Sequence, residues 1–356
     1  MKKYNFSAGP SVLPQEVVEK AAAAVVEFEG TGLSLAEISH RNKAFVNVME
    51  GARALVKEIL EVPEGYSVLF LQGGASLQFI MVAYNFMKVG GKAAYINTGV
   101  WSDKAIKEAK KFGEVEVIAS SEDKNHTYIP KDFVIPEDVD YVHFTSNNTI
   151  FGTQFKNFPK TDKPLICDMS SDIFSRKVNV SDFALIYAGA QKNVGSSGST
   201  IIIVKDELLG KSGRDIPSYL DYQVQIKNDS MFNTPACFAV YTSKLTLEWL
   251  KSLGGLDYIE KYNEKKAKML YDELDRNPLF IPVAEKEDRS LMNVTFVLKD
   301  EATHKEKFDA LCKDAGILDV KGHRLVGGYR ASIYNAMSIE GIEALIKVMQ
   351  TLEKEA

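Results

Sequence analysis

Residues 186–199 read Ile186-Tyr187-Ala188-Gly189-Ala190-Gln191-Lys192-Asn193-Val194-Gly195-Ser196-Ser197-Gly198-Ser199. The apolar run Phe183–Tyr187 leads into this loop of small and polar residues, and the apolar run Thr200–Val204 leaves it. Such runs are typical of buried strands, so the loop is expected to connect two strands and to carry one lysine, Lys192. The stretch alone leaves two interpretations open: a lysine that forms a Schiff base, or a surface lysine in a glycine-rich turn.

Outward from this loop, strand-like runs alternate with helical patterns. The expected strands are Ser67–Leu71, Lys92–Ile96, Val115–Ala119, Val139–Phe144, Pro164–Cys167, Ala184–Tyr187 and Thr200–Val204. Helical patterns at Ser76–Met87 and Ser102–Phe112 separate the first three of them. This alternation predicts an α/β fold with a mostly parallel sheet that is covered by helices on both faces. Ligands of such sheets bind beyond the carboxyl ends of the strands.

The pattern changes after about Phe238. Two long helical patterns meet at Gly254-Gly255, and shorter strands and helices follow them. We therefore expect an N-terminal segment (1–15), a large domain that contains the sheet (16–253) and a smaller C-terminal α+β domain (254–356).

Composition excludes several classes of protein. The chain has 356 residues, a net charge of −5 and no apolar run near the roughly 20 residues that span a bilayer. Neither a nucleic-acid partner nor a membrane partner is expected, since both favour a basic surface. Cys167, Cys237 and Cys312 lie far apart, which is typical of a reducing cytoplasm. The N-terminus lacks the apolar stretch of a secretory signal, and the five histidines show no metal-binding spacing.

Polar side chains follow the ends of several expected strands. Gly73-Gly74 opens a helix whose free backbone N–H groups suit a phosphate. Trp101 and Thr149 follow two further strands, and Asp168 closes another. A carboxylate there could hold a pyridine nitrogen protonated, so together with Lys192 the set suggests pyridoxal phosphate (PLP). Taken singly, each residue is equally well explained by a turn, a helix cap or a core aromatic side chain.

Three arginines suggest an anionic substrate. Arg41, Arg324 and Arg330 lie in expected loops or strand starts with histidine or glycine close by. A guanidinium offers a planar fork to carboxylate and phosphate groups, although each arginine alone could be a surface charge or part of an ion pair.

Together these motifs resemble the phosphoserine aminotransferases, class V members of the fold-type I PLP-dependent transaminases. The matching segments span the chain: Asn5–Pro10, Glu37–Arg41, Gly73–Phe79, Thr98–Ser102, Tyr187–Asn193, Met231–Pro235, Lys321–Arg324 and Val326–Asn335. The resemblance implies fold type I with its seven-stranded type of sheet, and a cytoplasmic homodimer. It also implies reversible amino transfer from L-glutamate to 3-phosphohydroxypyruvate, which gives O-phospho-L-serine and 2-oxoglutarate in L-serine biosynthesis. Members of the family also act on 4-phosphohydroxy-L-threonine in pyridoxine biosynthesis.

The resemblance assigns a role to each matched position. Lys192 would form the Schiff base and move the substrate proton, and Asp168 would pair with the ring nitrogen. Further cofactor contacts would come from Ala75, Ser76, Trp101, Thr149 and Gln191, and from Asn233 and Thr234 of the neighbouring subunit. Arg330 would bind the α-carboxylate. The substrate phosphate or the distal carboxylate of glutamate would lie among His40, Arg41, His323 and Arg324.

Two positions depart from the family pattern. Some members carry an arginine where this chain has Ser76, so one phosphate-binding charge is either absent or supplied elsewhere. Residues 195–198 read Gly-Ser-Ser-Gly where many members have Gly-Pro-Ala-Gly, which would change the stiffness of the loop but not the chemistry.

Three alternatives compete with this interpretation. A cysteine desulfurase would need a reactive cysteine in a mobile loop, whereas the three cysteines lie in apolar or helical contexts. An alanine–glyoxylate type transaminase would share the fold and the lysine but has no need for the His-Arg pairs. A sugar- or nucleotide-binding module without catalysis would not form a Schiff base at Lys192.

Overall fold

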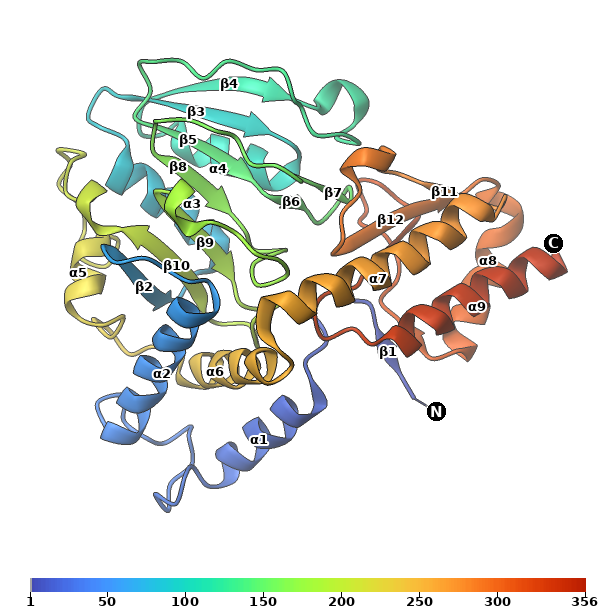
Figure 1. The fold of residues 1–356 in the computed structure, drawn as a ribbon, viewed down its shortest axis with the longest axis horizontal. Helices are drawn as coiled ribbons and strands as arrows, with labels where there is room; N and C mark the ends of the chain where they lie inside the picture. Colours follow the sequence, from blue (N-terminus) through green and yellow to red (C-terminus); the bar gives the residue numbers. More distant parts are fainter. Residues whose placement is uncertain (1) are drawn as a thin grey trace.

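The computed structural model describes residues 2–356, and its centre is a seven-stranded sheet (Figure 1). The strand order is β2 (Tyr66–Leu71), β10 (Thr200–Lys205), β9 (Leu185–Gly189), β8 (Leu165–Asp168), β5 (Tyr141–Thr145), β3 (Lys92–Asn97) and β4 (Glu114–Ser120). The pairs from β9 to β4 are parallel, whereas β10 pairs antiparallel with both β9 and β2. The predicted α/β fold with a mostly parallel sheet is confirmed.

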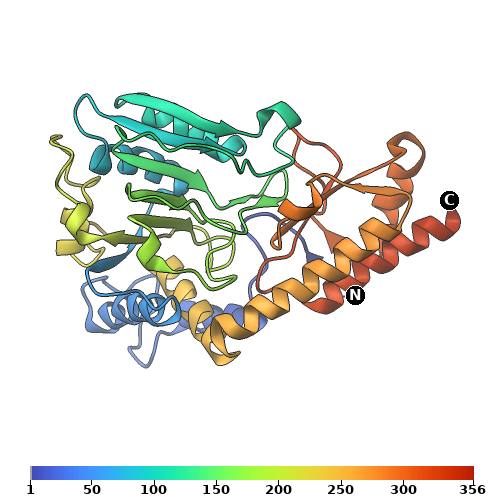
Figure 2. The same cartoon turned by 45° about the horizontal axis from the view of Figure 1, so that its top comes forward.

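Helices bury both faces of this sheet. On one face lie α1 (Gln15–Val26), α2 (Lys43–Ile59) and α6 (Cys237–Ser252); on the other lie α3 (Gly74–Phe86), α4 (Val100–Ala109) and the short α5 (Tyr222–Lys227). Figure 2 shows the blue helices α1 and α2 beneath the sheet. In β5, Val142 and Phe144 contact the first layer while Tyr141 contacts the second, because successive side chains point to opposite faces. Strands buried on both faces read as continuous apolar runs, which is why the sequence revealed them.

A second, smaller core lies beyond the sheet. It contains the antiparallel strands β11 (Phe280–Pro282), β12 (Asn293–Leu298) and β14 (Tyr329–Ser332), with helices α8 (Glu301–Asp314) and α9 (Ile339–Glu355). The long helix α7 (Gly255–Arg276) joins the two cores (Figure 1): Leu256 and Ile259 pack in the first, and Leu270 and Leu274 in the second. The domain boundary near residue 254 stays a prediction.

The N-terminal segment runs between the two cores. Its strand β1 (Tyr4–Asn5) pairs in parallel with β13 (Ile317–Leu318), and Phe6 is fully buried in the smaller core. A two-stranded hairpin, β6 (Asn147–Asn148) with β7 (Thr153–Gln154), lies on the sheet side of the same junction. None of the helices in residues 2–356 is long and apolar enough to cross a membrane.

Candidate active site at the carboxyl ends of the strands

A cavity of about 240 Å³ lies at the carboxyl ends of β3, β5, β8 and β9. Of the residues singled out from the sequence, it is lined by Ala75, Trp101, Thr149, Asp168, Gln191, Lys192, His323 and Arg330. Strand ends of a parallel sheet meet along one edge, which is why residues far apart in the chain converge here. Arg330 and His323 reach the cavity from the smaller core, so both parts of the molecule form its walls.

Lys192 is buried and extends into this cavity from the loop after β9. Its Nζ donates to Thr149 Oγ1 at 2.9 Å and to Ser171 Oγ at 2.8 Å. Burial lowers the pKa of Lys192 to about 8; Asp168 opposes this shift, and Arg330 adds to it. An amine with this pKa is partly neutral near physiological pH, and a neutral amine is what attacks a carbonyl group.

Asp168 is the last residue of β8 and is 4% exposed. Its Oδ1 accepts a hydrogen bond from the backbone N–H of Ser170 at 2.9 Å. Burial raises the pKa of Asp168, while the Ser170 hydrogen bond and the charge of Lys192 act in the opposite direction. A buried carboxylate with one amide donor retains capacity for a cationic N–H donor, as a protonated pyridine would provide.

The start of α3 offers backbone donors on another side of the cavity. Gly73 and Gly74 have φ angles of +91° and +63°, and a Cβ at Gly73 would lie 2.5 Å from Leu77. Only glycine fits this sharp entry into the helix. The turn leaves the N–H groups of Ala75 and Ser76 free at the positive end of the helix dipole. Ala75 lines the cavity, whereas the side chain of Ser76 is exposed and does not line it.

Trp101 lies in the first turn of α4, directly after β3. Its ring centroid is 5.9 Å from Lys192 Nζ, and its buried Nε1 has no hydrogen-bond partner among the described residues. An aromatic ring beside the reactive lysine provides a surface on which a flat cofactor ring can stack.

Arg330, in β14, is a half-buried cation without a carboxylate partner anywhere in residues 2–356. Its Nη1 makes a long contact of 3.5 Å with the carbonyl oxygen of Thr149, and its buried Nε has no partner. Burial lowers the pKa of Arg330. A desolvated guanidinium without an anion is costly, so this fork is suited to an anionic ligand that enters the cavity. His323 lies nearby. Its pKa is lowered mainly by burial and, to a lesser degree, by the charge of Arg330.

The remaining candidates lie outside the cavity of this single chain. Arg41 and Arg324 are exposed, and His40 is buried with an unpartnered Nε2. Asn233 and Thr234 are also exposed, although the Thr234 carbonyl accepts a hydrogen bond from Gln72 Nε2 at 2.7 Å, beside the start of α3.

Several residues of the cavity were not assigned a role from the sequence: Ala8, Gly9, Thr145, Asn147, Ile150, Ser170 and Ser171. The N-terminal segment reaches the cavity because Ser11 is bonded to the lysine loop, through its N–H to Gln191 O (2.9 Å) and its hydroxyl to Lys192 O (2.5 Å). A Cβ on Gly9, whose φ is +145°, would lie 3.4 Å from Lys192 Cγ. Gly9, which belongs to the matching segment Asn5–Pro10, is therefore part of the cavity wall.

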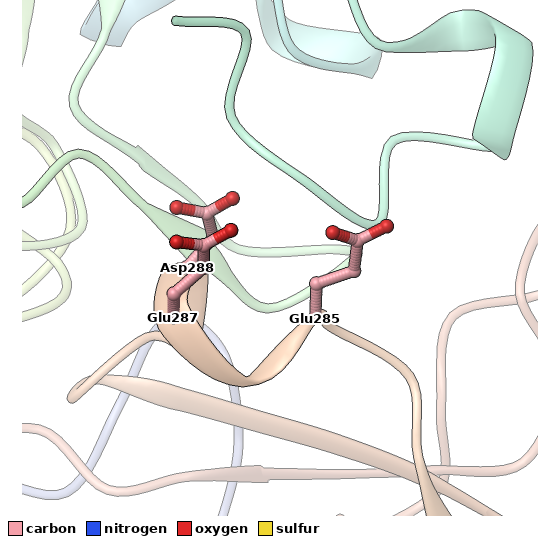
Figure 3. Close-up of side chains that lie close together, drawn as sticks. All are labelled: Glu285, Glu287 and Asp288. Atoms are coloured by element: carbon pink, nitrogen blue, oxygen red, sulfur yellow. The ribbon is translucent and has the colours of Figure 1, made fainter.

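Three carboxylates elsewhere, Glu285, Glu287 and Asp288, lie close together before β12 (Figure 3). Lys124 is 3.0 Å from Glu285, and Lys131 is 2.7 Å from Glu287 and 3.7 Å from Asp288. These ion pairs tie the smaller core to the 124–131 loop and explain the cluster without a ligand. A larger open depression of about 800 Å³ lies beside it, and none of the residues singled out from the sequence lines that depression.

Known proteins match the chain over its full length. Residues 3–345 match the family model for aminotransferase class-V. The phosphoserine aminotransferase of Flavobacterium johnsoniae is 60% identical over 356 residues, with both chains fully covered. A phosphoserine aminotransferase structure determined to study radiation damage of its Schiff base superposes with a TM-score of 0.97 at 46% identity, covering 100% of this chain and 99% of the other. The PLP-bound phosphoserine aminotransferase of Trichomonas vaginalis gives a TM-score of 0.93 at 36% identity, covering 98% and 100%. The chain therefore belongs to the class-V aminotransferases and, within them, to the phosphoserine aminotransferase family.

Proposed function

We propose that this protein transfers the amino group of L-glutamate to 3-phosphohydroxypyruvate, giving O-phospho-L-serine and 2-oxoglutarate, as a PLP-dependent transaminase of L-serine biosynthesis. The observation that carries the proposal is the arrangement in one cavity of the buried Lys192, the carboxylate of Asp168 and the unpaired guanidinium of Arg330. A Schiff-base lysine, a partner for a pyridine nitrogen and a carboxylate fork are what amino transfer through PLP requires.

The residues present fit this cofactor. Asp168 would hold the ring nitrogen protonated, since its carboxylate has room for one more donor. The N-terminus of α3, with Ala75 and Ser76, would bind the phosphate, and Trp101 would stack on the ring. When bound, PLP supplies the electron sink that stabilises negative charge at the substrate Cα. Lys192 would take the proton from the substrate Cα on its ε-nitrogen and deliver it to C4′ of the cofactor.

The substrate would be held by its charges. Arg330 would clamp the α-carboxylate, because a bidentate guanidinium–carboxylate pair fixes position as well as affinity. His323 lines the cavity beside Arg330 and, with Arg324, would lie near the phosphate of phosphoserine or the distal carboxylate of glutamate. Phosphoserine and glutamate each carry a second anionic group besides the α-carboxylate. This second group explains why the site would need Arg324 and His323 in addition to Arg330.

We further propose a cytoplasmic homodimer in which each subunit completes the other's site. Asn233 and Thr234 are exposed, and so are the neighbouring Phe232 and Phe238, whose apolar rings would be stabilised by burial against a partner. A second subunit packed there would bury both rings and bring Asn233 and Thr234 to a cofactor phosphate, and it could likewise supply His40 and Arg41.

Reduction with borohydride tests the proposal directly. Borohydride converts a Schiff base into a stable secondary amine, so the purified protein should carry a pyridoxyl group on the peptide that contains Lys192. Peptide mass mapping locates the group. An adduct on another lysine, or no adduct, would rule out a transaminase that uses Lys192.

Substitution of Arg324 tests the substrate. Arg324→Ala should lower kcat/KM for phosphoserine by at least about tenfold and for glutamate by much less, because a phosphate carries more charge than a carboxylate. The two half-reactions can be followed separately by cofactor absorbance. Lys321→Ala is the matched control, since Lys321 is in the same loop but is paired with Asp309 at 3.1 Å. Equal losses for both substrates in the Arg324 variant would count against a phosphate contact.

A further inference from the structure

Ser171 lies against the reactive lysine, but no role follows for it from the motifs of the sequence. Its side chain is 4% exposed and lines the cavity, with Oγ 2.8 Å from Lys192 Nζ. The same hydroxyl is hydrogen-bonded to the hydroxyl of Thr149, which also contacts Lys192. Lys192 has no carboxylate within ion-pair distance among the described residues, so two neutral hydroxyls are its partners.

We propose that Ser171 is a positioning residue that holds the ε-amine of Lys192 in both of its protonation states while the amine is not covalently bound. This inference rests on the proposed function, in which Lys192 is released from the cofactor and then takes up and gives back a proton. When Thr149 contacts the polar edge of the cofactor ring, as the resemblance implies, Ser171 is the hydroxyl that remains for the amine.

The chemistry of a hydroxyl explains why serine suits this place. An ammonium group has donors only, and the Ser171 oxygen accepts one of them. A neutral amine has a lone pair, and the Ser171 O–H can then donate to it. The Thr149 hydroxyl compensates for this reversal, because it accepts from Ser171 in the first state and donates to it in the second. A carboxylate at position 171 would instead fix the amine as ammonium, and an alanine would leave it without this partner.

The turn that carries Ser171 is firmly held. The N–H groups of Asp172 and Ile173 both bond to Met169 O, at 3.1 and 2.9 Å. The Asp172 carboxylate accepts hydrogen bonds from the Ser146 hydroxyl and from Gln154 Nε2, the latter at 3.0 Å. Ser171 therefore does not need to reorganise to meet the amine, which is the condition for a positioning role.

If Ser171 only supported the fold, its removal would leave the pKa of Lys192 unchanged. This pKa is therefore the first quantity to measure. In the cofactor-free full-length chain, the rate at which fluorodinitrobenzene labels Lys192, followed by peptide mass mapping across pH, reports that pKa. A hydrogen bond to the charged ammonium is stronger than one to the neutral amine, so Ser171→Ala should destabilise the ammonium more, and the labelling midpoint should fall by about one pH unit. Ser171→Thr keeps a hydroxyl and should restore the midpoint. Ser175→Ala, in the same turn but with its hydroxyl bonded to Asp172 O (2.6 Å), is the control and should leave the midpoint unchanged.

The holoenzyme provides the second readout. With glutamate deuterated at Cα, Ser171→Ala should raise the kinetic isotope effect on the half-reaction, because a less well-placed amine makes proton transfer slower. Should the alanine variant not fold, Ser171→Cys, whose thiol is a weak acceptor, is expected to shift both quantities in the same direction. A midpoint and an isotope effect equal to those of Ser175→Ala would overturn the role of Ser171. Absence of a Lys192 adduct in the wild-type holoenzyme would instead overturn the proposed function, whatever the labelling midpoint.

Discussion

Lys192→Met is expected to abolish amino transfer and, at the same time, to stabilise the cofactor-free chain. The loss of activity should exceed about 10⁴-fold, because the variant loses both the Schiff-base nitrogen and the group that moves the proton. The gain in stability follows from burial: the amine lies in a cavity wall without a carboxylate partner among residues 2–356, and methionine fills a similar volume without a charge.

The pH dependence identifies the origin of that gain. The pKa of Lys192 falls from 10.5 to about 8 on folding, so the unfolded chain binds more protons between these pH values. The free energy of unfolding of the wild-type chain should therefore rise with pH across this window, by on the order of 3 kcal/mol. Below pH 8 the buried ammonium of Lys192 destabilises the folded chain by this full amount. The methionine variant lacks this contribution. Its advantage over wild type should be greatest at pH 7 and should vanish by about pH 10.5.

Urea unfolding of both cofactor-free chains at pH 7 and pH 10 measures this difference. Other groups that titrate in the same window contribute equally to both chains and cancel. Lys265→Met, at an exposed position on α7, is the control and should show no such pH-dependent gain. A constant difference between Lys192→Met and wild type at the two pH values would show that packing, not charge burial, separates them.

Arg330→Ala should weaken the binding of every amino-acid substrate by roughly two orders of magnitude or more. Truncating one partner of a buried hydrogen-bonded charge pair costs about 2–5 kcal/mol, and Arg330 has no other anion to bind among the described residues. Unlike Arg324→Ala, this variant should penalise glutamate and phosphoserine alike, since both carry the α-carboxylate.

Titration of the half-reactions by cofactor absorbance gives both dissociation constants. Arg330→Lys should recover only part of the affinity, because an ammonium cannot form the bidentate fork. Arg276→Ala is a suitable control: that arginine lies at the end of α7 and is paired with Glu273 (2.8 Å) and Glu353 (2.6 Å). A loss of less than about fivefold for either substrate in Arg330→Ala would contradict its assignment to the α-carboxylate.

Much of the fold could be predicted because every strand of the seven-stranded sheet except the edge strand β4 is buried along most of its length. Each of the seven expected strands is present within a few residues of its expected bounds. The direction of β10 could not be read from its apolar run. The length of the connection does indicate it. Only ten residues join β9 to β10, which is too few for the helix of a parallel crossover, so the two strands have to pair antiparallel. The six-residue helix α5 was missed because so short a segment shows no clear helical period.

The site was predictable where it depends on strand ends and not where it depends on packing between distant segments. Asp168 closes an apolar strand, and Trp101 and Thr149 each lie four residues past the end of one, in segments already matched to the family or rich in hydroxyl and amide groups. Ala8 and Gly9 enter the cavity only because Phe6 is anchored in the smaller core and Ser11 in the lysine loop. Ser171 lies three residues past the end of β8, in a turn whose orientation no sequence period reveals. The positions of Asn233, Thr234, His40 and Arg41 in an assembled site stay predictions.

The pairing of β1 with β13 also sets the order in which the site can be completed on the ribosome. Tyr4 is synthesised more than three hundred residues before its partner Ile317. At about 5–20 residues per second this delay is on the order of tens of seconds, during which the seven-stranded sheet can form. Throughout that interval the N-terminal wall of the cavity cannot take its final place. Synthesis through Ile317 therefore has to precede a closed cavity, so the nascent enzyme remains without a finished site until β13 is released.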